Sequence, residues 1–409
     1  MKASETRRWP RALIATALVL GACSGGIDRD QRADQATTTT NATAEPAPSP
    51  TADPATTAHA GPTRPPPTSV EPRHFTMAFA GDLLPHLPVV RSAAAAGAAS
   101  GRAHDFGPLL DGIRPVISAA DVALCHMEAP VAPDAESVRG YPAFGAPPEL
   151  IAGAAATGYD GCSTASNHSL DQGRAGIDAT LGTMDLLGLG HAGTGRTRTE
   201  AAAPAWYDAG GARIAHLSYA YGFNGIVPPA DAPWSANRID EGRILIEAAA
   251  ARAEGADFVV VSLHWGTEYV AEPDSQQVAL APDLLASPDI DLLIGHHAHV
   301  VQPIQRFGGE WVVFGLGNQL SNQSQPERRD GLTVVVTVSE RAGRFRVSAI
   351  RAVPTWVDLN GHRVLAVDAS LADPATDPSR RAELLASLVR TTDVVNRAGA
   401  VSDGSVTIG

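Results

Sequence analysis

Short apolar segments that end directly in acidic or imidazole side chains recur along this chain, and they restrict its fold more than any other feature. These segments are 75–80, 121–125, 159–165, 258–263 and 290–294. Helical patterns lie between them, for example over 147–156, 173–187 and 240–254. Short apolar runs that alternate with helices are typical of buried strands in an α/β fold. Because the carboxyl ends of such strands carry the ligand site, side chains far apart in sequence are expected to share one cleft.

The residues that follow these segments are of the types that bind divalent metal ions. The candidate ligands are Asp82, Glu128, Asn167, His264, His297 and His299. Oxygen and nitrogen donors together suit Zn, Mn or Fe, and no cysteine stands in a Cys-x-x-Cys zinc pattern. His297 and His299 are two residues apart, and extended backbone would place both imidazoles on one face. The donors suffice for two ions, and paired ions about 3.5–4 Å apart can clamp a phosphoryl oxygen and lower the pKa of a bridging water.

The order of these motifs is also informative. The motifs are Gly81-Asp82, His126-Met127-Glu128, Asn167 to Asp171, His264 to Tyr269, Gly295 to His299, and Phe314 to Asn318. In this order they resemble the capsule-synthesis CapA (poly-gamma-glutamate capsule) family of the calcineurin-like metallophosphoesterase superfamily. The similarity spans about residues 75–356. It implies a layered α/β/β/α sandwich with the site at the carboxyl ends of the strands. It also implies that the six candidate ligands bind metal and that His168 protonates the leaving oxygen.

Other residues of the motifs are expected to support the site or to contact substrate. They are His86, His126, Asp171, Trp265, Glu268, Tyr269, His296 and Asn318. The superfamily has a histidine where Leu84 stands, so His86 is either a substitute ligand or a loop histidine. His296 is expected to point away from the cleft or to support it, because one of three near-adjacent histidines must face outward. Trp265 and Tyr269 line the cleft or pack in the core, and Glu268 is placed to hydrogen-bond a ligand histidine.

The N-terminal residues have the pattern of an export signal. Basic residues precede the apolar run 12–20, which is too short to span a bilayer but suits the core of a signal peptide. Leu20 to Cys23 resembles a bacterial lipobox, which implies cleavage before Cys23 and a lipid on its thiol. We therefore expect an exported protein that is lipid-anchored to the outer face of the bacterial cell membrane. A plain secretory signal with a chance cysteine is the alternative, and the export route, general secretory or twin-arginine, stays open.

These features divide the chain into four parts. A signal peptide over 1–22 is followed by a Pro/Thr/Ala-rich linker over 23–72, whose composition cannot form a packed core. The CapA-type domain is expected over 73–365. Residues 366–409 are expected to form an amphipathic helix over 378–397 and a loose tail after residue 398.

Charge and cysteine content restrict the partners. A net charge of −13 argues against nucleic acid as a partner, because nucleic-acid-binding proteins neutralise phosphates with a basic face. Arg328 and Arg329 are a candidate local site for an anionic polymer. Cys125 and Cys162 lie near the ends of neighbouring predicted strands, where free buried thiols are the commoner state, so we expect free thiols rather than a disulfide.

Two functions fit these observations. The first is a divalent-metal-dependent hydrolase that acts on a phosphoester or an amide of capsule, poly-gamma-glutamate or another cell-envelope polymer. The second is a non-catalytic accessory protein whose metal-containing cleft binds an anionic polymer and passes it to capsule-export or ligase proteins. Turnover of phosphate esters would separate the two.

Overall fold

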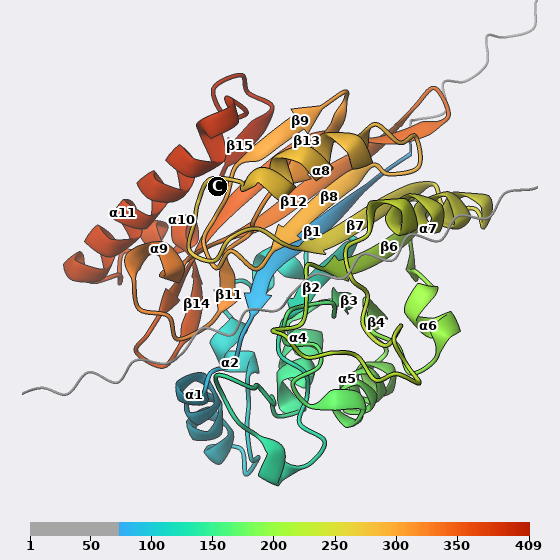
Figure 1. The fold of residues 1–409 in the computed structure, drawn as a ribbon. Helices are drawn as coiled ribbons and strands as arrows, with labels where there is room; N and C mark the ends of the chain where they lie inside the picture. The colour runs from blue at the N-terminus through green and yellow to red at the C-terminus, as the bar shows by residue number, and fades with distance from the viewer. Residues whose placement is uncertain (1–72) are drawn as a thin grey trace, which may run out of the picture. The chain divides into compact units, whose positions relative to one another are not determined.

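The computed structural model describes residues 73–409 (Figure 1). The expected signal peptide 1–22, Cys23 and the linker 23–72 lie outside the described residues. Within 73–409, no helix combines the length and the hydropathy that a membrane span requires.

The strands form two sheets. The first contains β1 (His74–Leu83), β2 (Val122–Met127), β3 (Gly161–Ser163), β4 (Gly190–Ala192), β11 (Asn318–Leu320), β12 (Asp330–Arg341), β13 (Arg344–Asp358), β14 (Arg363–Ala366) and β15 (Val406–Ile408). The second contains β5 (Ala205–Ala209), β6 (Ala212–Ala220), β7 (Phe258–His264), β8 (Leu292–His296), β9 (Ile304–Phe307) and β10 (Glu310–Val313). The order is β14-β13-β12-β1-β2-β3-β4 in the first sheet, with β11 beside β1 and β15 beside β13, and β5-β6-β7-β8-β10-β9 in the second. In each sheet the strands that carry the sequence motifs are parallel to one another.

Helices cover the outer faces of both sheets (Figure 1). They are α1 (Leu87–Ala98), α2 (Gly107–Leu110), α3 (Arg114–Ile117), α4 (Glu149–Thr157), α5 (Gly173–Leu187), α6 (Arg198–Ala202), α7 (Glu241–Ala253), α8 (Ser275–Leu285), α9 (Pro326–Arg329), α10 (Val367–Ala372) and α11 (Pro378–Val395). Residues of α1, α2, α4 and α5 pack on the first sheet, and residues of α7 and α8 pack on the second.

The two sheets pack face to face through an apolar layer. Phe75, Met77 and Phe79 of β1 contribute to this layer, whereas Ala78 and Ala80 face the helices on the other side. Strands β7 and β8 alternate in the same way, since Phe258 and Val260 face the first sheet while Val259 and Val261 face α7 and α8. This period of two residues places helix, sheet, sheet and helix in successive layers. The expected α/β/β/α layering is therefore confirmed.

The C-terminal tail differs from the expectation. Helix α11 occupies most of the range expected for the amphipathic helix, and its Leu384 is fully buried. The tail expected to be loose instead contains β15, which pairs in parallel with β13 through Val406, Thr407 and Ile408. Val406 supplies the reason, because its side chain is buried in the apolar layer between the sheets. The prediction of a loose tail rested on its Gly/Ser content and did not take this short apolar segment into account.

Candidate metal centre

The strands direct their last polar side chains into the space between the sheets. In β2, Leu124 belongs to the apolar layer, and two residues later His126 has the same orientation. His264 follows Val260 in β7 at an even spacing, and His296 follows Ile294 in β8. The apolar layer therefore ends in a polar cluster at the carboxyl ends of the strands, as the alternation of strand side chains requires.

Asp82 joins this cluster because of an irregularity in β1. Strict alternation from Phe79 would turn Asp82 toward the helices. The pairing of β1 with β2 shifts register between Phe79 and Asp82, so that Asp82 lies opposite His126. An extra residue of this kind turns the following side chain to the other face. Gly81 allows the shift, because a Cβ atom at this position would lie 2.1 Å from the carbonyl oxygen of Gly317.

The segment after β8 differs from the expectation in its backbone. His297 and His299 were expected in extended backbone, but their φ angles are +91° and +55°. His296 was expected to support the site or to face outward; all three imidazoles are buried, and that of His296 contacts the candidate ligand Asp82 with 3.2 Å between Nδ1 and Oδ1. Left-handed backbone at two positions turns the chain so that no histidine is forced out. Such conformations cost about 1–3 kcal/mol each and concentrate at functional sites.

Four overlapping groups of side chains are arranged as metal sites require. In each group one ligand atom per residue lies within 4.8 Å of the others. The groups are Asp82, His126 and His296; Glu128, His264 and His297; Glu268, His297 and His299; and Asp82, Glu128 and His299. The fold thus brings together five of the six candidate ligands and adds His126, His296 and Glu268. The cluster is compatible with metal binding.

The sixth candidate, Asn167, lies beside the cluster in a chain of hydrogen bonds. His264 Nε2 donates to Asn167 Oδ1 over 3.0 Å. His264 Nδ1 in turn accepts from His126 Nε2 over 2.9 Å, and His126 Nδ1 accepts from Ser163 Oγ over 2.7 Å. These bonds satisfy His126 and His264 within the protein. They show that hydrogen bonds alone can account for part of the cluster.

Hydrogen bonds do not offset the burial of the Glu128 carboxylate. Both of its carboxylate oxygens are buried and have no hydrogen-bond partner among the described residues, and the same holds for His297 Nδ1. Its nearest basic atom is His299 Nε2, 3.5 Å from Oε1. Burial of a carboxylate without partners is costly. The residues present therefore fit a cation, which would supply the missing partner.

The electrostatics of the cluster differ from residue to residue. Although burial opposes it, the carboxylates of Glu128 and Asp82 raise the pKa of His299 to about 9. Burial raises the pKa of Glu128 well above its usual value. Burial of the imidazoles acts in the opposite direction, holding the pKa of His264 well below its usual value and that of His297 at about 3. For Asp82, hydrogen bonds from neighbouring imidazoles outweigh burial and hold the pKa of this carboxyl well below its usual value. Neutral imidazoles and an ionised carboxylate are the forms that bind metal ions.

His168 lies beside this cluster and is held by Asp171. His168 Nδ1 donates to Asp171 Oδ2 over 2.7 Å, and the same oxygen accepts the backbone N–H of Phe144 over 2.6 Å. The edge of the Phe144 ring meets the imidazole with 4.7 Å between centroids. Because Asp171 accepts the proton on Nδ1, Nε2 remains the nitrogen that can exchange a proton with a substrate.

Two residues that the sequence motifs do not include complete the surroundings. Asn167 Nδ2 donates to Asn224 Oδ1 over 3.2 Å, which turns the carbonyl oxygen of Asn167 toward His264. Tyr221 lies against His297 with 4.6 Å between ring centroids. Both follow β6, whose end carries no acidic or imidazole side chain. The only sequence signal is an aromatic and a turn residue after an apolar strand, which is common in proteins of every function.

Two of the expected supporting residues lie outside the cluster. Trp265 is fully buried in the core between the second sheet and its helices, and its Nε1 donates to the carbonyl of Phe314 over 3.0 Å. Of the two alternatives expected for Trp265, the structure has the one in which it packs in the core, since the alternation that begins in β7 turns its side chain toward α8. His86 Nδ1 donates to the carbonyl of Leu84 over 3.1 Å, and His86 belongs to none of the four groups.

Asn318 and Tyr269 contact the cluster through His299. Asn318 Oδ1 lies 3.1 Å from His299 Nδ1, and Asn318 Nδ2 donates to the carbonyls of His299 and Arg328. The ring of Tyr269 stacks on His299 with 5.8 Å between centroids, and Tyr269 is 40% exposed. Glu268 is exposed and approaches His297 and His299.

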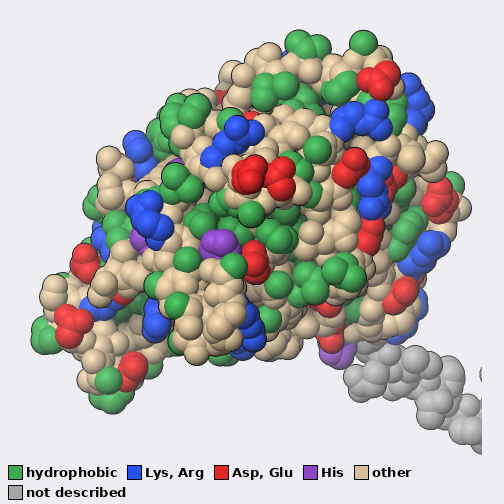
Figure 2. All heavy atoms as spheres, turned by 90° about the horizontal axis from the view of Figure 1, so that it is seen from below, with side chains coloured by type: hydrophobic (Ala, Val, Ile, Leu, Met, Phe, Trp, Pro, Cys, Tyr) green, Lys and Arg blue, Asp and Glu red, His purple; other side chains and the backbone are tan. Residues whose placement is uncertain are grey.

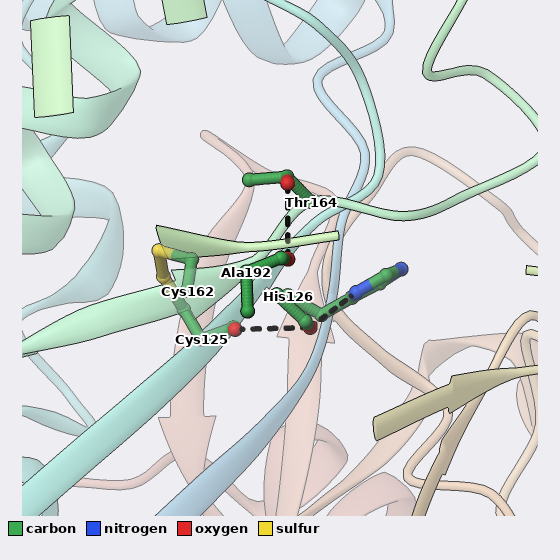
Figure 3. The surroundings of a disulfide bond; sticks show 6 residues. Cys125, His126, Cys162, Thr164 and Ala192 are labelled. Carbon is green, nitrogen blue, oxygen red and sulfur yellow. Dashed lines mark hydrogen bonds between the residues drawn. A yellow bond between two sulfur atoms is a disulfide. The ribbon is translucent and has the colours of Figure 1, made fainter. Parts of the chain in front are cut away.

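The two strand cysteines form a disulfide, which corrects the expectation of free thiols. Cys125 of β2 and Cys162 of β3 face each other in parallel register, with 4.4 Å between Cα atoms. Figure 3 shows that the bridge lies directly before His126. The next residues in register are His126 and Ser163, which are joined by a hydrogen bond. The disulfide therefore fixes the pair of strands that hold this histidine.

Comparison with known proteins shows the family to which this chain belongs. The model of the bacterial capsule synthesis protein PGA_cap matches residues 76–323, more than half of the chain, and the match contains all the motifs described above. This chain belongs to the PGA_cap family of bacterial capsule synthesis proteins. The expected family is confirmed.

Curated relatives of this PGA_cap protein include two CapA proteins. The PGA biosynthesis protein CapA of Bacillus subtilis is 30% identical over 190 residues, which are 46% of this chain and 49% of that protein. The capsule biosynthesis protein CapA of Bacillus anthracis is 26% identical over 189 residues, 46% of each chain. A probable polyglutamine synthesis accessory protein of Mycobacterium tuberculosis is 26% identical over 215 residues, 49% of this chain and 56% of that protein. The chain spans about half the length of the curated relatives it matches.

Solved structures with a similar arrangement include phosphoesterases. The calcineurin-like phosphoesterase YfkN from Bacillus subtilis has a TM-score of 0.43 and 14% identity, over 79% of this chain and 97% of that chain. A putative 5'-nucleotidase from Staphylococcus aureus has a TM-score of 0.42 and 15% identity, over 76% of this chain and 59% of that chain.

Proposed function

We propose that this PGA_cap protein is a divalent-metal-dependent hydrolase that cleaves a phosphoester or an amide in a cell-envelope polymer. The observation that carries the proposal is the carboxylate of Glu128, which is buried without a hydrogen-bond partner among the described residues. It lies among imidazoles whose pKa values are lowered by burial, such as that of His297. A site with this composition is costly to fold unless a cation offsets the charge.

The ligands that we propose come from both sheets. Asp82, Glu128 and Asn167 would supply oxygen, His264, His297 and His299 would supply nitrogen, and His126 and His296 lie close enough to complete a second set. We propose two ions, of Mn, Fe or Zn, because these metals accept mixed nitrogen and oxygen ligands. Bound divalent ions would polarise the scissile group and lower the pKa of a water to near neutrality.

His168 is proposed as the general acid. Asp171 accepts the Nδ1 proton of His168, so a proton on Nε2 can pass to the leaving oxygen or nitrogen. Asp171 also accepts the backbone N–H of Phe144, which holds its carboxyl group in place beside His168. Proton transfer by a positioned side chain contributes about 10²- to 10⁴-fold to the rate.

The proposed substrate and location rest on the family and on the N-terminal sequence. The CapA proteins of the two Bacillus species are named for PGA and capsule biosynthesis. We therefore propose an anionic envelope polymer as the substrate and capsule-export or ligase proteins as partners. We further propose export and lipid attachment at Cys23, which predicts that Cys23→Ser moves the protein from the membrane fraction to the soluble fraction.

Metal analysis and turnover of chromogenic substrates test the hydrolase proposal. The protein purified without chelator is expected to contain a divalent transition metal and, with added Mn²⁺, to hydrolyse p-nitrophenyl phosphate, bis-p-nitrophenyl phosphate or γ-glutamyl p-nitroanilide. His168→Ala should keep its metal and lose about 10²- to 10⁴-fold in kcat. His74→Ala is a matched control, since His74 is exposed at the opposite end of β1 from Asp82.

The outcomes separate the two candidate functions. A protein that stays metal-free after incubation with Mn²⁺, Zn²⁺ or Fe²⁺ refutes the metal site and the hydrolase together. A protein that binds metal but hydrolyses none of the three substrates supports the accessory, polymer-binding function instead. If His168→Ala retains full turnover, the hydrolase stands but the proton donor has been assigned incorrectly.

A further inference from the structure

Arg328 is distinguished from the arginines around it by its lack of an acidic partner. Arg329 donates to the carbonyl of Val357 over 3.1 Å and lies 3.7 Å above the ring of Trp356. The neighbouring Arg390 and Arg397 also pair with carboxylates, namely those of Asp330 and Glu272. Among the described residues, no carboxylate lies within 4.0 Å of the Arg328 guanidinium, and its Nε is buried without a hydrogen-bond partner.

Two contacts fix Arg328 beside the candidate metal centre. Its guanidinium carbon lies 3.5 Å from the centroid of the Tyr269 ring, and this ring stacks on His299. Asn318 makes the second link, because its Oδ1 lies next to His299 Nδ1 while its Nδ2 donates to the carbonyl of Arg328 over 2.9 Å. The Tyr269 ring therefore contacts both the guanidinium of Arg328 and the imidazole of His299, and the Asn318 amide contacts the backbone of Arg328 and the imidazole of His299.

A guanidinium held in this way is prepared to bind an anion. Stacking on an aromatic ring occupies the face of the group and leaves the N–H donors along its edge available. Those donors match the spacing of the oxygens of a carboxylate or a phosphate. Arg328 is also half-buried, so its charge is screened less than that of a surface arginine.

Neither the net charge of the protein nor the face drawn in Figure 2 supplies this recognition. The protein carries a net charge of −13, which repels a polyanion at long range. Figure 2 shows acidic and basic side chains interspersed on the face that it presents, rather than a broad basic field. An anionic substrate must therefore be recognised locally, next to the cluster.

We propose that Arg328, held by Tyr269 and Asn318, binds an oxyanion group that the substrate carries next to the bond to be cleaved. This inference rests on the proposed function and narrows its substrate to molecules with a carboxylate or a phosphate beside the reacting group. Arg329 has no such role, because its contacts hold α9 against β13.

The test compares a charged oligomer with its neutral form, and adds an oligomer that carries phosphate instead of carboxylate. Binding to the Mn²⁺-treated full chain is measured by calorimetry for a short γ-glutamyl oligomer, for the same oligomer with its free carboxylates converted to amides, and for a glycerol-phosphate oligomer. The protein is expected to bind one of the two charged oligomers at least about tenfold more tightly than the amide, because charge-assisted hydrogen bonds contribute roughly this much. The preferred one identifies the group as carboxylate or phosphate.

Variants assign the preference to Arg328. In Arg328→Ala the preference for charge should fall to within about twofold, and Arg328→Lys should retain part of it, since lysine keeps the charge but lacks the paired donors. Arg341→Ala, an exposed arginine at the end of β12, is the control and should behave as the parent. Thermal unfolding and metal content of each variant report whether the fold and the cluster are intact.

Two results would overturn the inference. One is equal binding of charged and amidated oligomers, or no binding of either, by the parent protein. The other is an Arg328→Ala variant that is folded and retains the full preference. Neither result affects the hydrolase proposal, which depends on metal content and on turnover by the parent protein and by His168→Ala.

Discussion

Replacing Glu128 by methionine is predicted to stabilise the metal-free protein and to remove its response to metal. Both oxygens of Glu128 are buried without a hydrogen-bond partner among the described residues. A buried polar group left unsatisfied costs about 1–3 kcal/mol, and a charged group costs more. Methionine has a similar length and needs no partner, so Glu128→Met should raise the free energy of unfolding by about 1–3 kcal/mol in the presence of a chelator.

The stabilisation of the fold by metal should be smaller in Glu128→Met than in the parent protein. A ligand at a hundredfold its Kd stabilises the folded state by about 2.7 kcal/mol. The parent protein should show a gain of this size in urea denaturation with Mn²⁺ compared with chelator. Glu128→Met should show less than about a third of it, because one oxygen ligand shared by two of the groups has been removed. The variant would thus be more stable than the parent without metal, and this difference should shrink by about 2 kcal/mol or more when Mn²⁺ is added.

A second buried carboxylate provides the control. Glu310 is 6% exposed and pairs with Arg346, although its Oε2 has no partner among the described residues. Glu310→Met leaves Arg346 without its partner and should therefore lower the stability, with and without metal alike. The two variants differ in the partner of the carboxylate. Glu310 pairs with the guanidinium of Arg346, whereas the nearest basic atom to Glu128 is His299 Nε2, 3.5 Å away and without a hydrogen bond to it.

Two results would contradict the proposed role of Glu128 as a metal ligand. If metal-free Glu128→Met is less stable than the parent by more than about 1 kcal/mol, the carboxylate is a structural partner of His299 and the cluster is a polar network. If the metal-free gain appears but the response to Mn²⁺ is unchanged, Glu128 is not a ligand. Either result would falsify the ligand set proposed here.

Three further predictions concern single features of the fold. Asn224→Ala should weaken Mn²⁺ binding in calorimetric titration by about 10- to 100-fold, because it frees the amide of Asn167 to rotate, whereas Asn224→Asp keeps the accepting oxygen and should lose less. Burial lowers the pKa of His216 to about 3, so this group stabilises the fold above its unfolded value near 6.5 and the contribution is lost as the pH falls toward 3. His216→Gln should therefore lose about 2 kcal/mol less stability than the parent between pH 7 and pH 5 in urea denaturation. Removing the disulfide in Cys125→Ala/Cys162→Ala should lower the free energy of unfolding by up to about 4 kcal/mol, and mass spectrometry after alkylation should find neither thiol free in the parent; a cost near zero would show that the bridge does not constrain the unfolded chain.

Much of the site could be predicted because strand ends are visible in the sequence. The apolar runs before Asp82, His126 and His264 correspond to β1, β2 and β7, and the carboxyl ends of these strands meet. The inward direction of His126 was also available from the sequence. His126 follows Leu124 at a spacing of two, so both side chains lie on the same face of β2. The alternation within each strand was a better guide than the type of residue.

The remaining features depend on tertiary contacts. The register shift that turns Asp82 between the sheets arises where β1 meets β2 and the segment of Gly317, which are distant in sequence. The positive φ angles of His297 and His299 could not be predicted from the local sequence, since left-handed backbone is uncommon for any residue other than glycine. These features are set by the packing of the two sheets. Patterns over a few neighbouring residues carry no information about that packing.

The position of the cluster between the sheets explains why stability and metal binding are opposed in this fold. The layer between the sheets is apolar over most of its length, and its last positions carry charged and polar groups instead of side chains such as Leu124. Within the protein, polar links between the sheets at this edge include the hydrogen bonds from His126 to His264, from His264 to Asn167 and from His296 to Asp82. They leave Glu128 uncompensated. A fold selected for stability alone would continue the apolar layer, so the retention of this costly arrangement is best explained by a cation that both sheets bind together.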